Sequence, residues 1–147
     1  MKVKEIMTRD IISVGPGTSL VQVTSLLSKH AITGVPVVEN GDLVGIVTEF
    51  DVMKKWVEFY VPSYIGLLSQ AQTGDKMDSD KLAELGDMKV KDIMTIDVIT
   101  ADEDGEVEEV AKVIVEKDIN PLPVLDAKGM LVGVVSRSDI VRSALPK

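Results

Sequence analysis

The sequence predicts a mixed α/β (α+β) fold, built from two copies of one β-α-β-β-α unit that pack sheet to sheet. The first observation is an internal repeat, because three blocks recur in the same order at a spacing of 87 or 88 residues. The second is that short apolar runs alternate with helical patterns inside each copy. The matching blocks are Val3–Thr8 with Val90–Thr95, Gly34–Val38 with Pro121–Leu125, and Gly45–Asp51 with Gly133–Asp139.

The repeat divides the chain into three parts. We expect repeat 1 at residues 1–55, a joining segment at 56–88 and repeat 2 at 89–147. Neither copy is large enough to bury a good core alone, so the two copies are expected to cover each other's sheets.

Composition narrows the class of protein. The 147 residues are 45% hydrophobic, enough for a packed core, and include no cysteine, so neither a disulfide nor a thiolate metal site is expected. The net charge of −8 argues against a nucleic-acid-binding protein. Pro, Gly and polar residues interrupt the uncharged stretches at 11–28 and 59–74, and no signal peptide is recognisable. We therefore expect a cytoplasmic protein without a membrane span.

Each copy begins with a short helical turn, around Ile6 or Ile93, followed by a brief strand. The strand is expected at Ile11–Val14 in repeat 1 and at Val98–Ala101 in repeat 2. A helix comes next, with Thr18 as the expected N-cap in repeat 1. The apolar residues on one face of this helix are Leu20, Val23, Leu26 and Leu27 in repeat 1, and Val107, Val110, Ala111, Ile114 and Val115 in repeat 2.

A β-hairpin and a closing helix complete each copy. In repeat 1 the apolar runs Val35–Glu39 and Leu43–Thr48 are separated by Asn40-Gly41-Asp42, which is a typical turn sequence of a β-hairpin. In repeat 2 the corresponding turn is Asp126–Gly129. The closing helices are expected to begin near positions 50 and 138.

The joining segment differs from both repeats. All five aromatic residues of the chain lie between positions 50 and 64. Two interpretations stay open for them, namely packing or a dimer contact on the one hand and docking of another protein on the other. The expected elements are an extension of the first closing helix up to Pro62, a short helix from Ser63 to Leu68, a surface loop at 71–80, and a helix from Asp78 or Ser79 to Gly86.

The strongest candidate for a binding site is the end of the last strand in each copy. There a Gly and two apolar residues are followed by Thr48 or Ser136 and, three residues on, by Asp51 or Asp139. The hydroxyl and carboxylate are expected on one side of a helix N-terminus, where a carboxylate accepts hydrogen bonds from a vicinal diol such as a ribose. The alternative is a capping box that serves only the helix.

No catalytic or metal-binding cluster is predicted, so we do not expect an enzyme. His30, the single histidine, is expected at the exposed end of the first helix. The sequence holds no His/Asp/Glu group with metal-ligand spacing, no serine paired with a base, and no Gly-rich phosphate loop.

Three motifs occur once in each repeat and in the same order: the Ile-Met-Thr opening, the Pro-containing strand and the strand ending. With these motifs the chain resembles a stand-alone tandem pair of cystathionine-β-synthase (CBS) domains, a Bateman module. The resemblance implies two β-α-β-β-α units packed sheet to sheet around a pseudo-twofold axis. It implies two clefts for adenosine-containing ligands such as AMP, ADP, ATP or S-adenosylmethionine. It also implies a homodimer, because pairs of such modules usually form flat discs.

The resemblance assigns ligand-binding residues to each cleft. Gly34 and Pro121 stand where many members have a phosphate-binding basic residue, which disfavours a triphosphate unless basic residues come from elsewhere. The first cleft is expected to use Thr8, Ser13, Ile32, Thr33, Val134, Ser136, Arg137, Ser138 and Asp139. The second is expected to use Ile46, Thr48, Phe50, Asp51, Thr95, Thr100, Ile119 and Asn120.

Two functions follow from this resemblance. One is a ligand-sensing regulatory module that acts on a separate protein; the other is a constitutive dimerisation scaffold whose clefts are vestigial. The clefts are expected to differ, because Arg137 and Ser138 accompany Asp139 whereas Glu49 and Phe50 accompany Asp51. An anionic nucleotide is therefore expected in the Asp139 cleft first. The Asp51 cleft is expected to stay empty, to bind much more weakly, or to prefer a ligand with less negative charge such as S-adenosylmethionine.

Overall fold

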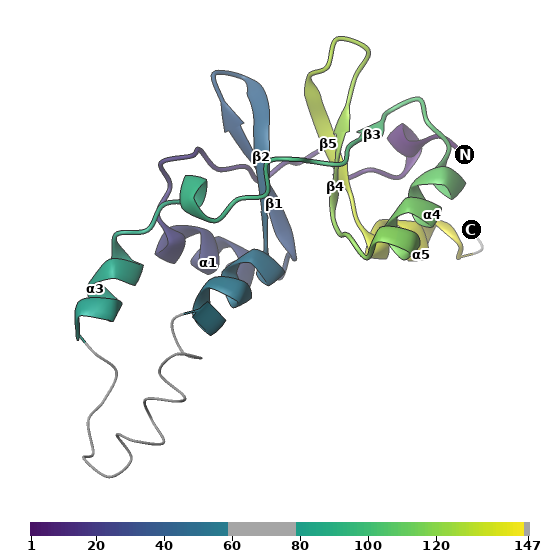
Figure 1. Cartoon of the computed structure of the whole chain (residues 1–147). Helices are drawn as coiled ribbons and strands as arrows, with labels where there is room; N and C mark the ends of the chain where they lie inside the picture. Colours follow the sequence, from purple (N-terminus) through teal and green to yellow (C-terminus); the bar gives the residue numbers. More distant parts are fainter. Residues whose placement is uncertain (59–78, 146–147) are drawn as a thin grey trace.

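The computed structural model describes residues 1–58 and 79–145 of the chain (Figure 1). Two similar halves follow one another, and each contains a short 3₁₀ turn, a helix, a hairpin and a closing helix. The elements are η1 (Val3–Glu5), α1 (Leu20–Lys29), β1 (Gly34–Glu39), β2 (Asp42–Thr48), a helix over residues 49–58, α3 (Ser79–Gly86), η2 (Val90–Asp92), β3 (Ala101–Asp102), α4 (Val107–Lys117), β4 (Leu122–Leu125), β5 (Leu131–Val135) and α5 (Arg137–Ser143).

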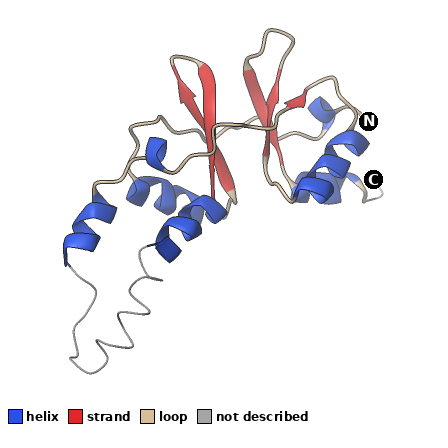
Figure 2. Ribbon diagram, in the orientation of Figure 1, coloured by secondary structure: helices blue, strands red, loops and turns tan. Residues whose placement is uncertain are grey.

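The hairpins of the two repeats lie side by side at the centre, and the helices lie toward the two ends (Figure 2). β1 pairs with β2 antiparallel, and in repeat 2 β4 pairs antiparallel with β5 and parallel with β3. The turn residues Asn40 and Gly41 both have positive φ, 52° and 85°, as the tight hairpin turn expected from Asn-Gly requires. Both predicted hairpins are therefore confirmed.

Two local predictions are wrong. Instead of a strand at Ile11–Val14, a single parallel bridge joins Val14 to Val37, because Gly15-Pro16-Gly17 follows at once and proline cannot donate to a ladder. In repeat 2 the strand covers only Ala101–Asp102 rather than Val98–Ala101.

The predicted N-cap of the first helix is also wrong by one residue. Ser19, not Thr18, caps α1, since the Ser19 hydroxyl accepts a hydrogen bond from the Gln22 N–H and the Ser19 N–H donates one to Gln22 Oε1. The Thr18 hydroxyl instead accepts from the Gly15 N–H at 3.2 Å.

The opening turns are exchanged between the repeats. Val3, from repeat 1, has no exposed surface and packs in the core of repeat 2 with Val124 and Ile114. Val90, from repeat 2, is equally buried and packs in the core of repeat 1 with Val35. The N-terminus accordingly lies beside α4 (Figure 1). Each core is complete only when both repeats are folded.

Equivalent contacts join the repeats and express the pseudo-twofold symmetry. Thr8 and Val134 exchange backbone hydrogen bonds of 2.8 and 3.0 Å, and Ile46 and Thr95 exchange bonds of 3.0 and 2.8 Å. The repeat-equivalent glycines Gly45 and Gly133 lie beside these bridges. A Cβ on Gly133 would approach the Met7 sulfur to 2.8 Å and the Thr8 carbonyl oxygen to 2.9 Å. The close contact between the repeats therefore leaves no room for a side chain at this position.

The joining segment is described only in part. The helix over residues 49–58 follows β2 directly, and α3 ends at Gly86 as predicted. The expected helix at Ser63–Leu68 and the aromatic residues beyond Trp56 lie outside the described residues. Among the helices that the structure does describe, none is long and apolar enough to cross a membrane.

Candidate ligand-binding clefts

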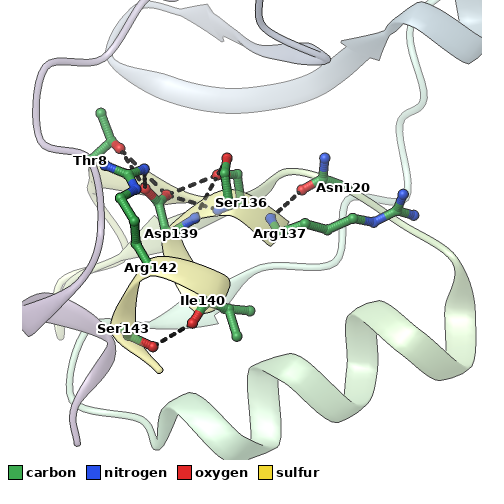
Figure 3. Close-up of polar contacts among 9 residues, drawn as sticks. Thr8, Asn120, Ser136, Arg137, Asp139, Ile140, Arg142 and Ser143 are labelled. Carbon is green, nitrogen blue, oxygen red and sulfur yellow. Dashed lines mark hydrogen bonds and ion pairs between the residues drawn. The ribbon is translucent and has the colours of Figure 1, made fainter. Parts of the chain in front are cut away.

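Both strand endings form the capping box that was one of the two alternatives. The Ser136 N–H donates to Asp139 Oδ2 at 2.9 Å, and the Asp139 N–H donates to Ser136 Oγ at 3.3 Å (Figure 3). In repeat 1 the Thr48 N–H donates to Asp51 Oδ2 at 2.9 Å, and the Asp51 N–H donates to Thr48 Oγ1 at 3.2 Å. These contacts fix both carboxylates at the first turn of a helix.

The two carboxylates also reach across to the other repeat. Thr8 Oγ1 donates to Asp139 Oδ1 at 3.3 Å, and Thr95 Oγ1 donates to Asp51 Oδ1 at 3.1 Å. Asp51 and Asp139 are 9% and 5% exposed, and they are the buried charged residues of the described chain. A capping role alone does not require a partner from the other repeat, so each carboxylate also connects the two repeats.

A cavity of about 410 Å³ opens beside Asp51. It contains every residue expected for the second cleft except Thr100. Thr100 is exposed, and its neighbours Val98 and Ile99 face the cavity instead. The lining residues are Thr33, Ile46, Thr48, Glu49, Phe50, Asp51, Thr95, Asp97, Val98, Ile99, Asp118, Ile119, Asn120, Pro121 and Arg137.

A second cavity, of about 160 Å³, lies beside Asp139. It contains the residues expected for the first cleft except Ser13 and Arg137. Ser13 is exposed, because side chains of an extended segment alternate and those of Ile12 and Val14 face inward. The lining residues are Thr8, Asp10, Ile12, Ala31, Ile32, Thr33, Gly34, Asn120, Pro121, Val134, Ser136, Ser138 and Asp139.

Arg137 lies on the opposite side from the one expected. It lines the Asp51 cavity, and its Nη2 forms an ion pair of 2.8 Å with Asp118 Oδ1. The cation beside Asp139 is Arg142, whose Nη2 lies 2.7 Å from Asp139 Oδ1 (Figure 3). Sequence reasoning missed Arg142, although its spacing of three residues from Asp139 on a helix places the two side chains within reach.

The two cavities share a wall on the pseudo-twofold axis. Thr33, Asn120 and Pro121 line both of them. Asn120 Nδ2 donates to Thr33 Oγ1 at 2.9 Å, and Asn120 Oδ1 accepts from the Arg137 N–H at 2.9 Å. The wall therefore connects the N-terminus of α5 to repeat 1.

Both cavities are acidic. Glu49, Asp97 and Asp118 line the larger cavity in addition to Asp51, and its one lining cation, Arg137, is paired with Asp118. In the smaller cavity Asp10 accompanies Asp139, and no basic residue of the described chain lines it. Within residues 1–58 and 79–145 no group of three or more His, Asp or Glu side chains is arranged to hold a metal ion.

Both repeats match a known family of sequences. The sequence model described as the CBS domain matches residues 3–58 and 90–145. The uncharacterized protein MJ1426 of Methanocaldococcus jannaschii is 34% identical over 155 residues, which cover 99% of this chain and 92% of that protein. The inosine-5′-monophosphate dehydrogenase of the same organism is 31% identical over 96% of this chain, which spans only 23% of the enzyme.

Solved structures share the same architecture. CBSX2 from Arabidopsis thaliana in complex with AMP is 27% identical, with a TM-score of 0.73 over 97% of this chain and 95% of that one. The CBS domain pair of protein MJ0100 in complex with 5′-methylthioadenosine and S-adenosyl-L-methionine is 30% identical, with a TM-score of 0.71 over 97% and 94% of the two chains.

Proposed function

The chain belongs to the CBS domain family, and on this premise we propose that it is a cytoplasmic regulatory module, which binds an adenosine-containing ligand between its repeats and acts on a protein target in trans. One observation carries the proposal: each buried carboxylate, Asp51 and Asp139, stands at a helix N-terminus on the wall of a cavity that both repeats line. Relatives of the same architecture hold AMP or S-adenosylmethionine.

The Asp51 cavity combines the surfaces that an adenosine requires. Ile46, Val98, Ile99 and Ile119 provide apolar contact for a base. On the wall of the same cavity the Asp51 carboxylate is a buried acceptor for ribose hydroxyls. Because the walls come from both repeats, an occupied cavity favours one arrangement of the repeats over others, which is the basis of a regulatory response.

The charges of the cavities favour a ligand with little negative charge. The acidic side chains of the walls repel phosphate groups, and the cation Arg137 is already paired with Asp118. The expectation of an anionic nucleotide in the Asp139 cavity loses its basis, because Arg137 does not line that cavity. We infer that S-adenosylmethionine or a neutral adenosyl compound binds more tightly than AMP, and AMP more tightly than ADP or ATP.

A homodimer is part of the proposal. A groove of about 380 Å³ between α4 and α5 is lined by the apolar residues Ala111, Ile114, Val115, Ile140 and Val141, and also by the ion pair of Asp118 and Arg137. Val115 and Val141 are 79% and 66% exposed, an unusual exposure for two valines that line the same groove. A second copy of the chain that covers this face would also carry the response from the cavities, since α5 begins at the Asp139 cap.

The alternative is a constitutive scaffold, and one observation favours it: both carboxylates already accept hydrogen bonds from other residues of the chain. A thermal-shift panel with AMP, ADP, ATP, S-adenosylmethionine and NAD distinguishes the two. A ligand at 100 times its Kd adds about 2.7 kcal/mol of stability. The regulatory proposal predicts a shift with at least one adenosyl compound, smaller in Asp51→Asn, whereas the scaffold predicts no shift with any.

A further inference from the structure

We propose that the two cavities are not equivalent: the Asp51 cavity takes the adenosyl ligand, and Arg142 keeps the Asp139 carboxylate closed to it. This inference rests on the proposed function and assigns its site. It reverses the order of occupancy that the sequence alone favours.

The two carboxylates differ in the number of hydrogen bonds that they accept. A carboxylate has about four acceptor positions. Asp139 accepts from the N–H and the hydroxyl of Ser136, from the Thr8 hydroxyl and from Arg142, so its positions are filled.

Among the residues that the structure describes, Asp51 accepts from one donor fewer. Its partners are the N–H and the hydroxyl of Thr48 and the hydroxyl of Thr95. One acceptor position of Asp51 therefore remains for a ribose hydroxyl, whereas a ribose at Asp139 must first displace a charge-assisted hydrogen bond of 2.7 Å.

The two cavities also differ in size. Ligand cavities in proteins usually measure about 300–1,000 Å³. The Asp51 cavity, at about 410 Å³, lies within this range, and the Asp139 cavity, at about 160 Å³, lies below it. The smaller cavity adjoins the filled carboxylate, so both observations point to the same site.

The two repeats carry different residues at two equivalent positions, and these differences produce the asymmetry. Lys54 occupies the position of Arg142, and Phe50 occupies the position of Ser138. Lys54 Nζ lies 5.7 Å from the centroid of the Phe50 ring, a cation–π contact that holds the ammonium on the ring. In repeat 2 the small Ser138 offers no ring, and the guanidinium three residues after Asp139 pairs with that carboxylate.

The test is isothermal titration calorimetry with S-adenosylmethionine, and with adenosine as an uncharged probe, on the full chain. The wild type is expected to bind one molecule per chain. Asp51→Asn, which keeps an oxygen for the cap, should weaken this event about tenfold or more. Arg142→Ala should add a second event, weaker than the first because the Asp139 cavity stays small, and Asp139→Asn in that background should remove it.

The matched control is Lys112→Ala, which removes an exposed cation from the same repeat and should leave one event of unchanged affinity. Two outcomes would overturn the inference while leaving the proposed function in place. One is two binding events of equal affinity in the wild type. The other is a single event in Arg142→Ala that is still measured after Asp51→Asn is added. No binding of either probe to any variant would overturn both.

Discussion

Asn120 donates a hydrogen bond of 2.9 Å to the hydroxyl of Thr33, the residue at the same position in the other repeat. The pair lies on the wall shared by both cavities. A second bond, from the Arg137 N–H to Asn120 Oδ1, connects the pair to the start of α5. A change in either cavity can thus alter this contact between the two repeats.

A double-mutant cycle tests this contact. Thr33→Val and Asn120→Ala should each lower the free energy of unfolding, and Asn120→Ala should cost more because it also removes the partner of the Arg137 N–H. The coupling energy should be about 0.5–1.5 kcal/mol. Urea unfolding of the wild type, both single variants and the double variant measures it, and strictly additive effects would show that the bond contributes nothing.

The glycines at the repeat contact are expected to tolerate no side chain. Gly133→Ala places a methyl group 2.8 Å from the Met7 sulfur and 2.9 Å from the Thr8 carbonyl oxygen, so the repeats must separate locally. We expect a loss of about 1–3 kcal/mol in urea unfolding. Gly17→Ala is the control, because a Cβ there meets nothing within 4 Å; equal effects of the two substitutions would argue against a close contact.

The exchanged N-terminal turn is held by ion pairs that depend on pH. Hydrogen bonds and charge from Lys4 and Lys2 lower the pKa of Asp104 and of Glu106 below their ordinary values of 3.8 and 4.5. Since the folded state binds these protons less readily than the unfolded chain, the pairs stabilise the fold above these ordinary values. That contribution is lost as the pH falls through the lower folded values.

Lys2 and Lys4 determine the upper limit of the pH range in which these ion pairs stabilise the fold. The same contacts raise the pKa of Lys2 and of Lys4 above 10.5, so their contribution is present below that pH and is lost as the pH rises through the raised values.

The measurement is the Tm difference between the wild type and the double variant Asp104→Asn/Glu106→Gln. It should be largest near neutral pH and should shrink toward pH 3 and at high salt. Glu116→Gln serves as the control, because the ion pair that it removes is longer: Lys112 Nζ lies 4.0 Å from Glu116 Oε1. A difference that is constant across pH would contradict the assignment.

The exposed valines predict self-association. Val141→Glu places a charge in the apolar groove between α4 and α5, and it should convert a dimer into a monomer at micromolar concentration in analytical ultracentrifugation. Met130→Glu, on an exposed apolar residue at the tip of the β4–β5 hairpin, should leave the dimer intact. A wild type that sediments as a monomer, with and without an adenosyl ligand, would refute the dimer.

Local pattern predicted much of this fold. The Asn-Gly turn and the apolar runs around it gave the β1–β2 hairpin, and the matching block gave β4–β5. The exchange of Val3 and Val90 between the cores was not predictable in this way, because apolar pattern shows that a residue is buried but not against which partner.

The site was predictable in its residue types and less so in its details. Asp51 and Asp139 stand where the repeat places them, each with the hydroxyl three residues before it. The side chain of Arg137 turned away because Asp118 offers a partner, and that contact joins residues 19 positions apart. The distinction between the cavities depends on such side-chain pairings, which the repeated backbone pattern does not reveal.

The most direct test of the account is a crystal structure of the chain grown with S-adenosylmethionine. We expect one ligand per chain in the Asp51 cavity, with ribose hydroxyls within hydrogen-bond distance of the Asp51 carboxylate, and with Arg142 still paired to Asp139. A ligand at Asp139 with Arg142 displaced, or empty cavities at a saturating ligand concentration, would contradict it.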